Sequence, residues 1–143
     1  MQTERLLLKI ALSTISSLSL KEKINLAKSL DNLHDLALHS SIEAIEAKIG
    51  RRLSAKSWNP DENARLAKAA VSRMNALGIS CVFFGEKEFP SMLREISDPP
   101  YALFFRGDLK IVEGNCVSVV GTRKITNGAK VAARDFAYDA ACD

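Results

Sequence analysis

The sequence has few of the features that mark secreted or metal-binding proteins. Only three of its 143 residues are cysteines, Cys81, Cys116 and Cys142, and they lie far apart without a CxxC pair. An odd number of cysteines without metal-ligand spacing argues against a disulfide framework and against a zinc site. We therefore expect three unpaired thiols in a reducing cytosol, each a small buried apolar side chain.

Long apolar runs are also missing. The N-terminal twenty residues are interrupted by Glu4, Arg5 and Lys9, and they contain no A-x-A-like cleavage site. A membrane-spanning helix needs about 20 apolar residues in succession. The sequence thus predicts a cytoplasmic protein that begins with a helix and has no membrane partner.

The chain has no strong excess of charge of one sign. Its formal net charge is +3, with 26% charged and 47% hydrophobic residues. This composition can form a hydrophobic core but is not that of a polycation. Any nucleic-acid site must therefore come from local clustering of basic residues. The length suits one domain or one and a half.

The first sixty residues predict a small bundle of short helices. Capping boxes, in which a serine precedes a glutamate by three positions, occur at Ser19–Glu22 and Ser40–Glu43. His34 and His39 have no carboxylate or cysteine pattern around them, so we expect surface or structural histidines. We expect Trp58 to be a packing residue.

Residues 59–78 form the clearest helical pattern. Asn59 suits the N-cap, Pro60 the first helical position and Gly78 the C-terminal end. The 3.6-residue period predicts that one face is buried, consisting of Leu66, Ala69, Ala70, Arg73 and Leu77.

After Gly78 the composition changes to an α/β pattern. Short apolar runs predict strands at residues 79–84, 101–105 and 115–120, with one or two helical turns at 89–96 and a helix over 127–143. Alanines on one face of the last helix would allow it to lie close to a sheet. We expect a parallel sheet of the doubly wound type.

The turn that follows the third predicted strand is the main functional signal. Gly121, Thr122 and Arg123 precede the last helix, whose N-terminus offers free N–H groups and a positive dipole end to an anion. Between Gly121 and Arg134 there are four basic residues and no acidic ones: Arg123, Lys124, Lys130 and Arg134. This segment is equally compatible with a phosphate site and with a solvated strand–helix connection.

Two nucleotide motifs are excluded by spacing. A P-loop needs a glycine five residues after its first glycine, where this chain has Thr126. A dinucleotide fingerprint needs a glycine where this chain has Arg123. No paired carboxylates, metal cluster or nucleophile motif occur, so we expect no catalytic activity and no cofactor.

The ordered run of motifs between Phe89 and Gly128 resembles the DNA-processing protein A (DprA/Smf) family. That family has an aromatic–Pro–x–x–Leu element, an Ile–x–Asp–Pro–Pro turn, a strand with a Gly–Asp turn, and a strand that ends in Val–Gly–Ser/Thr–Arg. The matching residues are Phe89, Pro90, Leu93, Ile96, Asp98, Pro99, Pro100, Leu103, Phe104, Gly107, Gly121, Thr122, Arg123 and Thr126. The chain departs from the family where Asn127 alone separates Thr126 from Gly128, one residue fewer than usual.

The resemblance implies a protein that binds single-stranded DNA in natural transformation and recombination and helps to load the RecA recombinase. It implies an α/β fold with a SAM-like helical domain over residues 1–58 and the N-terminal part of an extended Rossmann-like domain over 59–143. We expect a fragment of a longer protein that can form a homodimer at full length. The DNA phosphate site expected from the resemblance and the turn consists of Gly121, Thr122, Arg123, Lys124, Thr126 and Lys130.

Two alternatives stay open. The same pocket could hold a nucleotide-like metabolite in a Rossmann protein. The helical region could instead be a protein-interaction module joined to an inactive Rossmann fragment.

Overall fold

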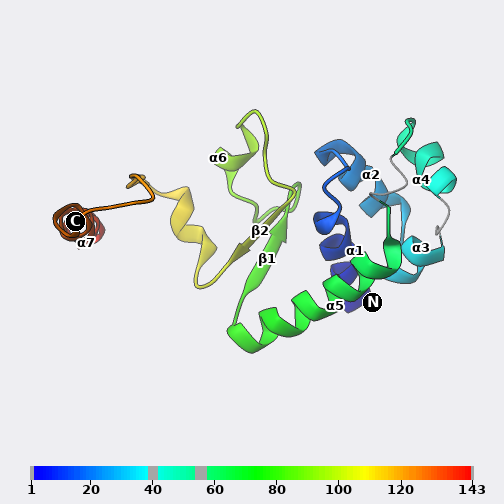
Figure 1. The fold of residues 1–143 in the computed structure, drawn as a ribbon, viewed down its shortest axis with the longest axis horizontal. Coiled ribbons are helices and arrows are strands. Elements are labelled where there is room, and N and C mark those ends of the chain that lie inside the picture. The colour runs from blue at the N-terminus through cyan, green and yellow to red at the C-terminus, as the bar shows by residue number, and fades with distance from the viewer. Residues whose placement is uncertain (1, 39–41, 54–57, 143) are drawn as a thin grey trace. The chain divides into compact units, whose positions relative to one another are not determined.

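The computed structural model describes residues 2–38, 42–53 and 58–142. It divides into two compact units, Met1–Lys110 and Ile111–Asp143. In Figure 1 the colours follow the chain from its N-terminus to its C-terminus, and labels mark the helices and strands. The boundary expected at residues 58 and 59 stays a prediction.

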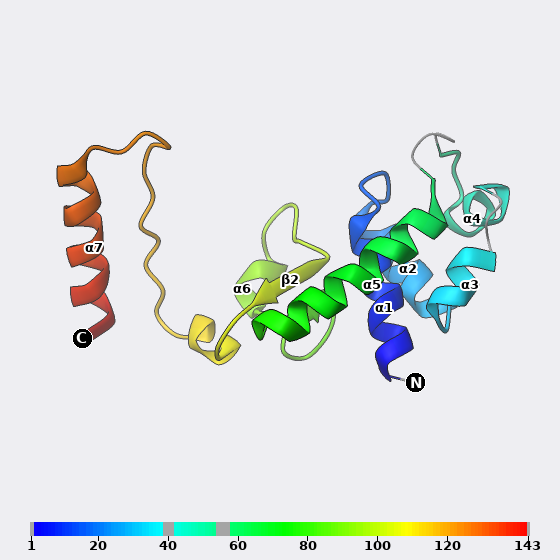
Figure 2. The ribbon, with the colours of Figure 1, turned by 60° about the horizontal axis from the view of Figure 1, so that its bottom comes forward.

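Five helices make up most of the first unit: α1 (Gln2–Thr14), α2 (Leu20–Ser29), α3 (Leu33–Leu38), α4 (Ile42–Ile49) and α5 (Pro60–Leu77). Helix α1 packs against α2, α3 and α5, and α2 also packs against α4. The crossing of α1 and α5 is visible in Figures 1 and 2. The predicted helical bundle is therefore confirmed, with α1 at its centre.

Local capping signals were accurate where the structure describes them. The Ser19 hydroxyl accepts from the Glu22 N–H, and the Glu22 carboxylate accepts from the Ser19 N–H at 2.7 Å, which confirms the first capping box. The second predicted box depends on Ser40, which lies outside the described residues, as does His39. His34 is exposed and Trp58 is buried, as expected.

Helix α5 begins and ends where predicted, but its buried face is different. The Asn59 side chain accepts from the Glu62 N–H, and Gly78 ends the helix at φ 62°. The buried residues are Pro60, Asn63, Ala67 and Met74, whereas Leu66 and Leu77 are 40% and 46% exposed. Of the predicted face only Ala70 packs against the core, where it is partly buried. The rest was wrong because the buried side is centred on Ala67, whose small side chain suits close packing of α5 on α1.

Two short strands complete the first unit. Strand β1 (Ser80–Phe83) pairs with β2 (Ala102–Phe105), with Ser80 opposite Phe105. The short helix α6 (Ser91–Arg94) lies between them in sequence and confirms the predicted helical turn. The pairing is antiparallel, so the expected parallel sheet is corrected for these strands. An antiparallel partner lets the chain turn back without a helical crossover.

Aromatic residues join this hairpin to the helical core. The rings of Phe83 and Tyr101 lie 5.6 Å apart, and both belong to the same buried cluster as the side chains of α1 and α2. Phe89 is 1% exposed and lies edge-on to Phe84, with 5.5 Å between ring centroids. The hairpin and the helices therefore share one hydrophobic core.

The second unit contains helix α7 (Asn127–Cys142), preceded by a 3₁₀ helix, η2 (Leu109–Glu113), that begins in the first unit. The strand predicted at residues 115–120 is not formed. Val117 and Val120 are exposed instead. A strand needs a neighbour for its backbone hydrogen bonds, and the only sheet in the described residues is β1–β2.

The three cysteines are unpaired, as predicted, but only Cys81 is partly buried, while Cys116 and Cys142 are exposed. The expectation of three buried thiols was therefore wrong for the two that lie in the second unit. Among the described residues, no helix combines the length and apolarity that a membrane crossing requires.

Candidate nucleic-acid interface

The predicted anion site lies at the start of α7. The helix begins at Asn127, as expected from the sequence. The Thr126 carbonyl accepts from the Lys130 N–H at 3.0 Å, and its hydroxyl accepts from the Ala129 N–H at 3.3 Å. Thr126 therefore acts as the N-cap of α7 and occupies the Ala129 donor, one of the groups that could otherwise face an anion.

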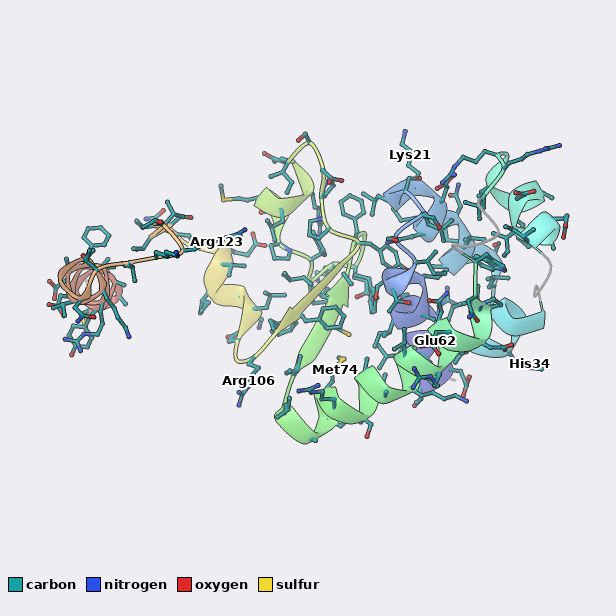
Figure 3. The ribbon with its side chains drawn as sticks, in the orientation of Figure 1. Lys21, His34, Glu62, Met74, Arg106 and Arg123 are labelled. Atoms are coloured by element: carbon teal, nitrogen blue, oxygen red, sulfur yellow. The ribbon has the colours of Figure 1, made fainter. Side chains whose placement is uncertain are left out.

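The predicted basic residues lie just before α7 and in its first turn. Arg123 lies in the connection before α7, as Figure 3 shows, with Lys124 beside it and Lys130 in the first turn. All three side chains are exposed, and no ion pair among the described residues involves them. The Lys124 N–H donates to the Thr122 hydroxyl at 3.4 Å, which bends the chain locally. Thr122, Arg123, Lys124 and Thr126 thus all lie in the short connection that leads into α7.

Arg134 behaves differently from the other basic residues. Its guanidinium donates to the Asp135 carboxylate at 3.1 and 3.2 Å, and both side chains are more than half exposed. An exposed pair of this kind is weak, but it partly neutralises Arg134. The unpaired positive charge therefore lies at the N-terminal end of α7.

Gly121 has no local structural requirement for glycine. It does not have positive φ, and a Cβ at this position would meet no atom within 4 Å. Neither backbone conformation nor intramolecular packing explains this residue. A glycine also lets a ligand approach the backbone closely, and for Gly121 this role is a prediction.

Family-pattern residues in the first unit have structural roles. Phe89 fills the core, and Gly107 adopts φ 89° in the turn after β2, a region that favours glycine. Sequence reasoning missed Arg94, whose guanidinium donates to the carbonyls of Glu86, Lys87 and Phe89 at 2.9, 3.2 and 2.7 Å. These bonds fix the loop between β1 and α6.

Comparison with known proteins places these elements in one family. Residues 80–143, from the start of β1 to the last residue, match the family described as DNA recombination-mediator protein A. The chain is 30% identical to Protein Smf of Borreliella burgdorferi over 118 residues, which is 81% of the chain and 36% of that protein. It is 28% identical to DNA processing protein DprA of Bacillus subtilis over 111 residues, which is 77% of the chain and 31% of that protein.

The extent of these matches is informative. The Borreliella match is longer than the family match, so it includes residues before position 80 and therefore part of the helical region. The chain spans about a third of the length of the curated relatives it matches. No solved structure matches it significantly. The motif order predicted this relationship, and the chain is a member of the DNA recombination-mediator protein A family, to which DprA and Smf belong.

Proposed function

We propose that this chain contributes to binding single-stranded DNA during DNA uptake and recombination, in a protein that helps to load the RecA recombinase. The proposed phosphate site consists of Gly121, Thr122, Arg123, Lys124, Thr126 and Lys130. Its role is binding without catalysis or a cofactor. Dimerisation belongs to the longer protein.

The observation that carries the proposal is a set of exposed, unpaired cations at the start of a helix. Arg123, Lys124 and Lys130 approach the positive end of the α7 dipole, and no acidic residue lies between Gly121 and Arg134. Backbone N–H groups and a guanidinium at a helix N-terminus favour phosphate oxygens. These residues lie within the family match, whose printed description is a recombination mediator.

The fold proposal accompanies the functional one. We propose that residues 1–58 form a SAM-like domain and that 59–143 are the opening part of an extended Rossmann-like domain. In that domain, residues 117–120 become a strand once neighbouring strands supply hydrogen-bond partners. The Gly121–Arg123 turn would then follow the carboxyl end of a strand, where open α/β sheets bind ligands.

A salt titration of single-strand binding tests the function. For single strands, log K falls with log salt by about 0.7 per neutralised phosphate. We expect Arg123→Ala to weaken binding of an oligothymidylate and to reduce the slope by about 0.7, one phosphate contact. Lys130→Ala should have a smaller effect, because a flexible cation lacks the planar fork of arginine.

The control is Arg73→Ala, which removes an exposed arginine from α5 in the other unit. It should leave affinity and slope unchanged. Binding that is equally strong and equally salt-dependent in wild type and Arg123→Ala would reject the proposed site. A shallow slope together with preference for a mononucleotide would instead favour a metabolite as the ligand.

A further inference from the structure

A pocket in the first unit lies far in sequence from the proposed phosphate site. It has a volume of about 410 Å³, within the range of about 300–1,000 Å³ that small-molecule sites occupy. Side chains of α1, α2 and the β1–β2 hairpin line it, so one ligand would contact three elements. The polar and aromatic lining residues are Arg5, Lys9, Lys28, Phe83, Phe84, Glu86 and Tyr101.

More basic than acidic side chains line this pocket. Lys9 pairs with Glu86, with 2.5 Å between Nζ and the carboxylate oxygen. Arg5 and Lys28 are exposed, and neither forms an ion pair within the described part of the chain. The pocket therefore has two positive charges without a carboxylate partner, which suits a ligand carrying a doubly charged anionic group.

Tyr101 is the one pocket-lining residue among the described residues whose buried hydroxyl lacks a partner. Its side chain lines the pocket and is only 8% exposed, yet its buried hydroxyl has no hydrogen-bond partner. Buried hydroxyls in native proteins are nearly always bonded, so an unpaired one calls for an explanation. Burial, followed by the nearby charge of Glu86, raises the pKa of Tyr101 above its usual range. The hydroxyl thus stays protonated and can donate a hydrogen bond to an acceptor.

The walls of the pocket are apolar and partly aromatic. Ile24, Ala27 and the half-buried ring of Phe84 are among the lining residues, and Phe89 packs edge-on against the Phe84 ring. A flat heterocycle can pack against such a surface while its anionic group stays among the cations.

We propose that this pocket binds a nucleotide unit, with its phosphate near Arg5 and Lys28 and its base against the apolar wall. The Tyr101 hydroxyl donates a hydrogen bond to the ligand. The nucleotide is either free or one residue of a strand, since both present the same chemistry. The inference does not depend on the proposed function, because the two sites share no residue.

Calorimetric titration of the full 143-residue chain tests the pocket. The probes are 2′-deoxyadenosine 5′-monophosphate, deoxyadenosine, inorganic phosphate and a short oligodeoxyadenylate. We expect saturable binding of the monophosphate, with deoxyadenosine and inorganic phosphate each much weaker. Tighter binding of the oligonucleotide would identify a strand as the source, and tighter binding of the monophosphate a free nucleotide.

Three variants and one control make the test specific. Tyr101→Phe removes only the unpaired hydroxyl and should raise the Kd roughly tenfold with no loss of thermal stability. Arg5→Gln and Lys28→Gln change exposed side chains and should raise the Kd several-fold without unfolding. Lys21→Gln, on α2 outside the pocket, is the matched control and should leave the Kd unchanged.

The outcomes also separate this site from the proposed DNA site. Arg123→Ala should leave binding of the monophosphate unchanged even if it abolishes strand binding. The inference fails if the wild type shows no saturable binding of the monophosphate. It also fails if inorganic phosphate binds as tightly, or if Tyr101→Phe and Arg5→Gln bind like the wild type.

Discussion

The two units of this chain differ in how they use apolar residues. In Met1–Lys110, side chains from five helices and a hairpin form one buried cluster. In the described part of the second unit, residues 111–142, no residue is buried, and Phe136 and Tyr138 of α7 are 55% and 70% exposed. Both units have apolar residues at helical spacing. Periodicity therefore specifies which residues can be buried, whereas burial itself requires a second surface.

This difference has energetic consequences. Most helical stability in proteins comes from packing an apolar face, and isolated helices shorter than about 12–15 residues are marginal in water even when they are rich in alanine. Helix α1 is packed on several sides, whereas α7, with 16 residues, depends mainly on its own hydrogen bonds and the Thr126 cap. We therefore expect the units to differ in stability. Two experiments compare the units, and two more test interactions within the packed unit.

Hydrogen exchange should show the largest contrast. Amides in the packed part of α1 should open only with global unfolding, which costs about 5–15 kcal/mol in typical domains. Amides of α7 should exchange with little protection. The measurement is exchange followed by mass spectrometry at a concentration where sedimentation shows a monomer. Uniformly slow exchange in that monomer would break the comparison, while slow exchange that appears only on self-association would locate an interface on the exposed apolar residues.

Truncation of apolar side chains sharpens the comparison next. Leu8 is 0% exposed in α1, so Leu8→Ala should lower the free energy of unfolding by about 2–5 kcal/mol. Phe136→Ala in α7 removes a larger side chain but should change it by no more than about 0.5 kcal/mol. Urea denaturation of both variants measures the difference. Equal losses would mean that Phe136 is packed in solution.

The sequence predicted local features of the first unit better than contacts between distant residues. The capping residues of α2 and α5 were correct because their hydrogen bonds join residues three apart. The buried face of α5 was wrong because the position of α1 decides it, and Leu66 ended up exposed. A pocket formed by Arg5, Lys28 and Tyr101 leaves no pattern in the sequence, since these residues are brought together only by the fold.

In the second unit, too, contacts with distant residues decide whether a predicted element forms. Residues 115–120 have strand composition, yet a strand forms only when a neighbour completes its hydrogen bonds. The order of the motifs nevertheless identified the family, because such a match depends on residue types and their order along the chain and not on burial. The start of α7 at Asn127 was predictable because its cap, Thr126, is local.

A cap substitution has a smaller expected effect. Asn59→Ala removes the acceptor for the Glu62 N–H, which lies 3.1 Å away at the start of α5, and should cost about 1 kcal/mol. Asn75→Ala, at an exposed position of the same helix, is the matched control and should be neutral or slightly stabilising, because alanine has the higher helix propensity. Thermal melts of both proteins provide the measurement. A control that loses as much as Asn59→Ala would refute the cap.

Acid titration should give the smallest effect, and it tests the electrostatics of the packed unit. The Arg51 guanidinium, 2.6 Å from the Glu22 carboxylate, lowers the pKa of Glu22 from 4.5 to about 2. Because this folded-state pKa lies below the unfolded value, the pair contributes stability above pH 4.5 and loses it as the pH falls through 2. Arg51→Gln should therefore flatten the decline of stability between pH 4.5 and 2. Arg65→Gln, which breaks the more exposed pair with Glu62, should flatten it less. Chemical denaturation at several pH values measures both slopes, and an unchanged slope in Arg51→Gln would show that Glu22 titrates normally in the folded chain.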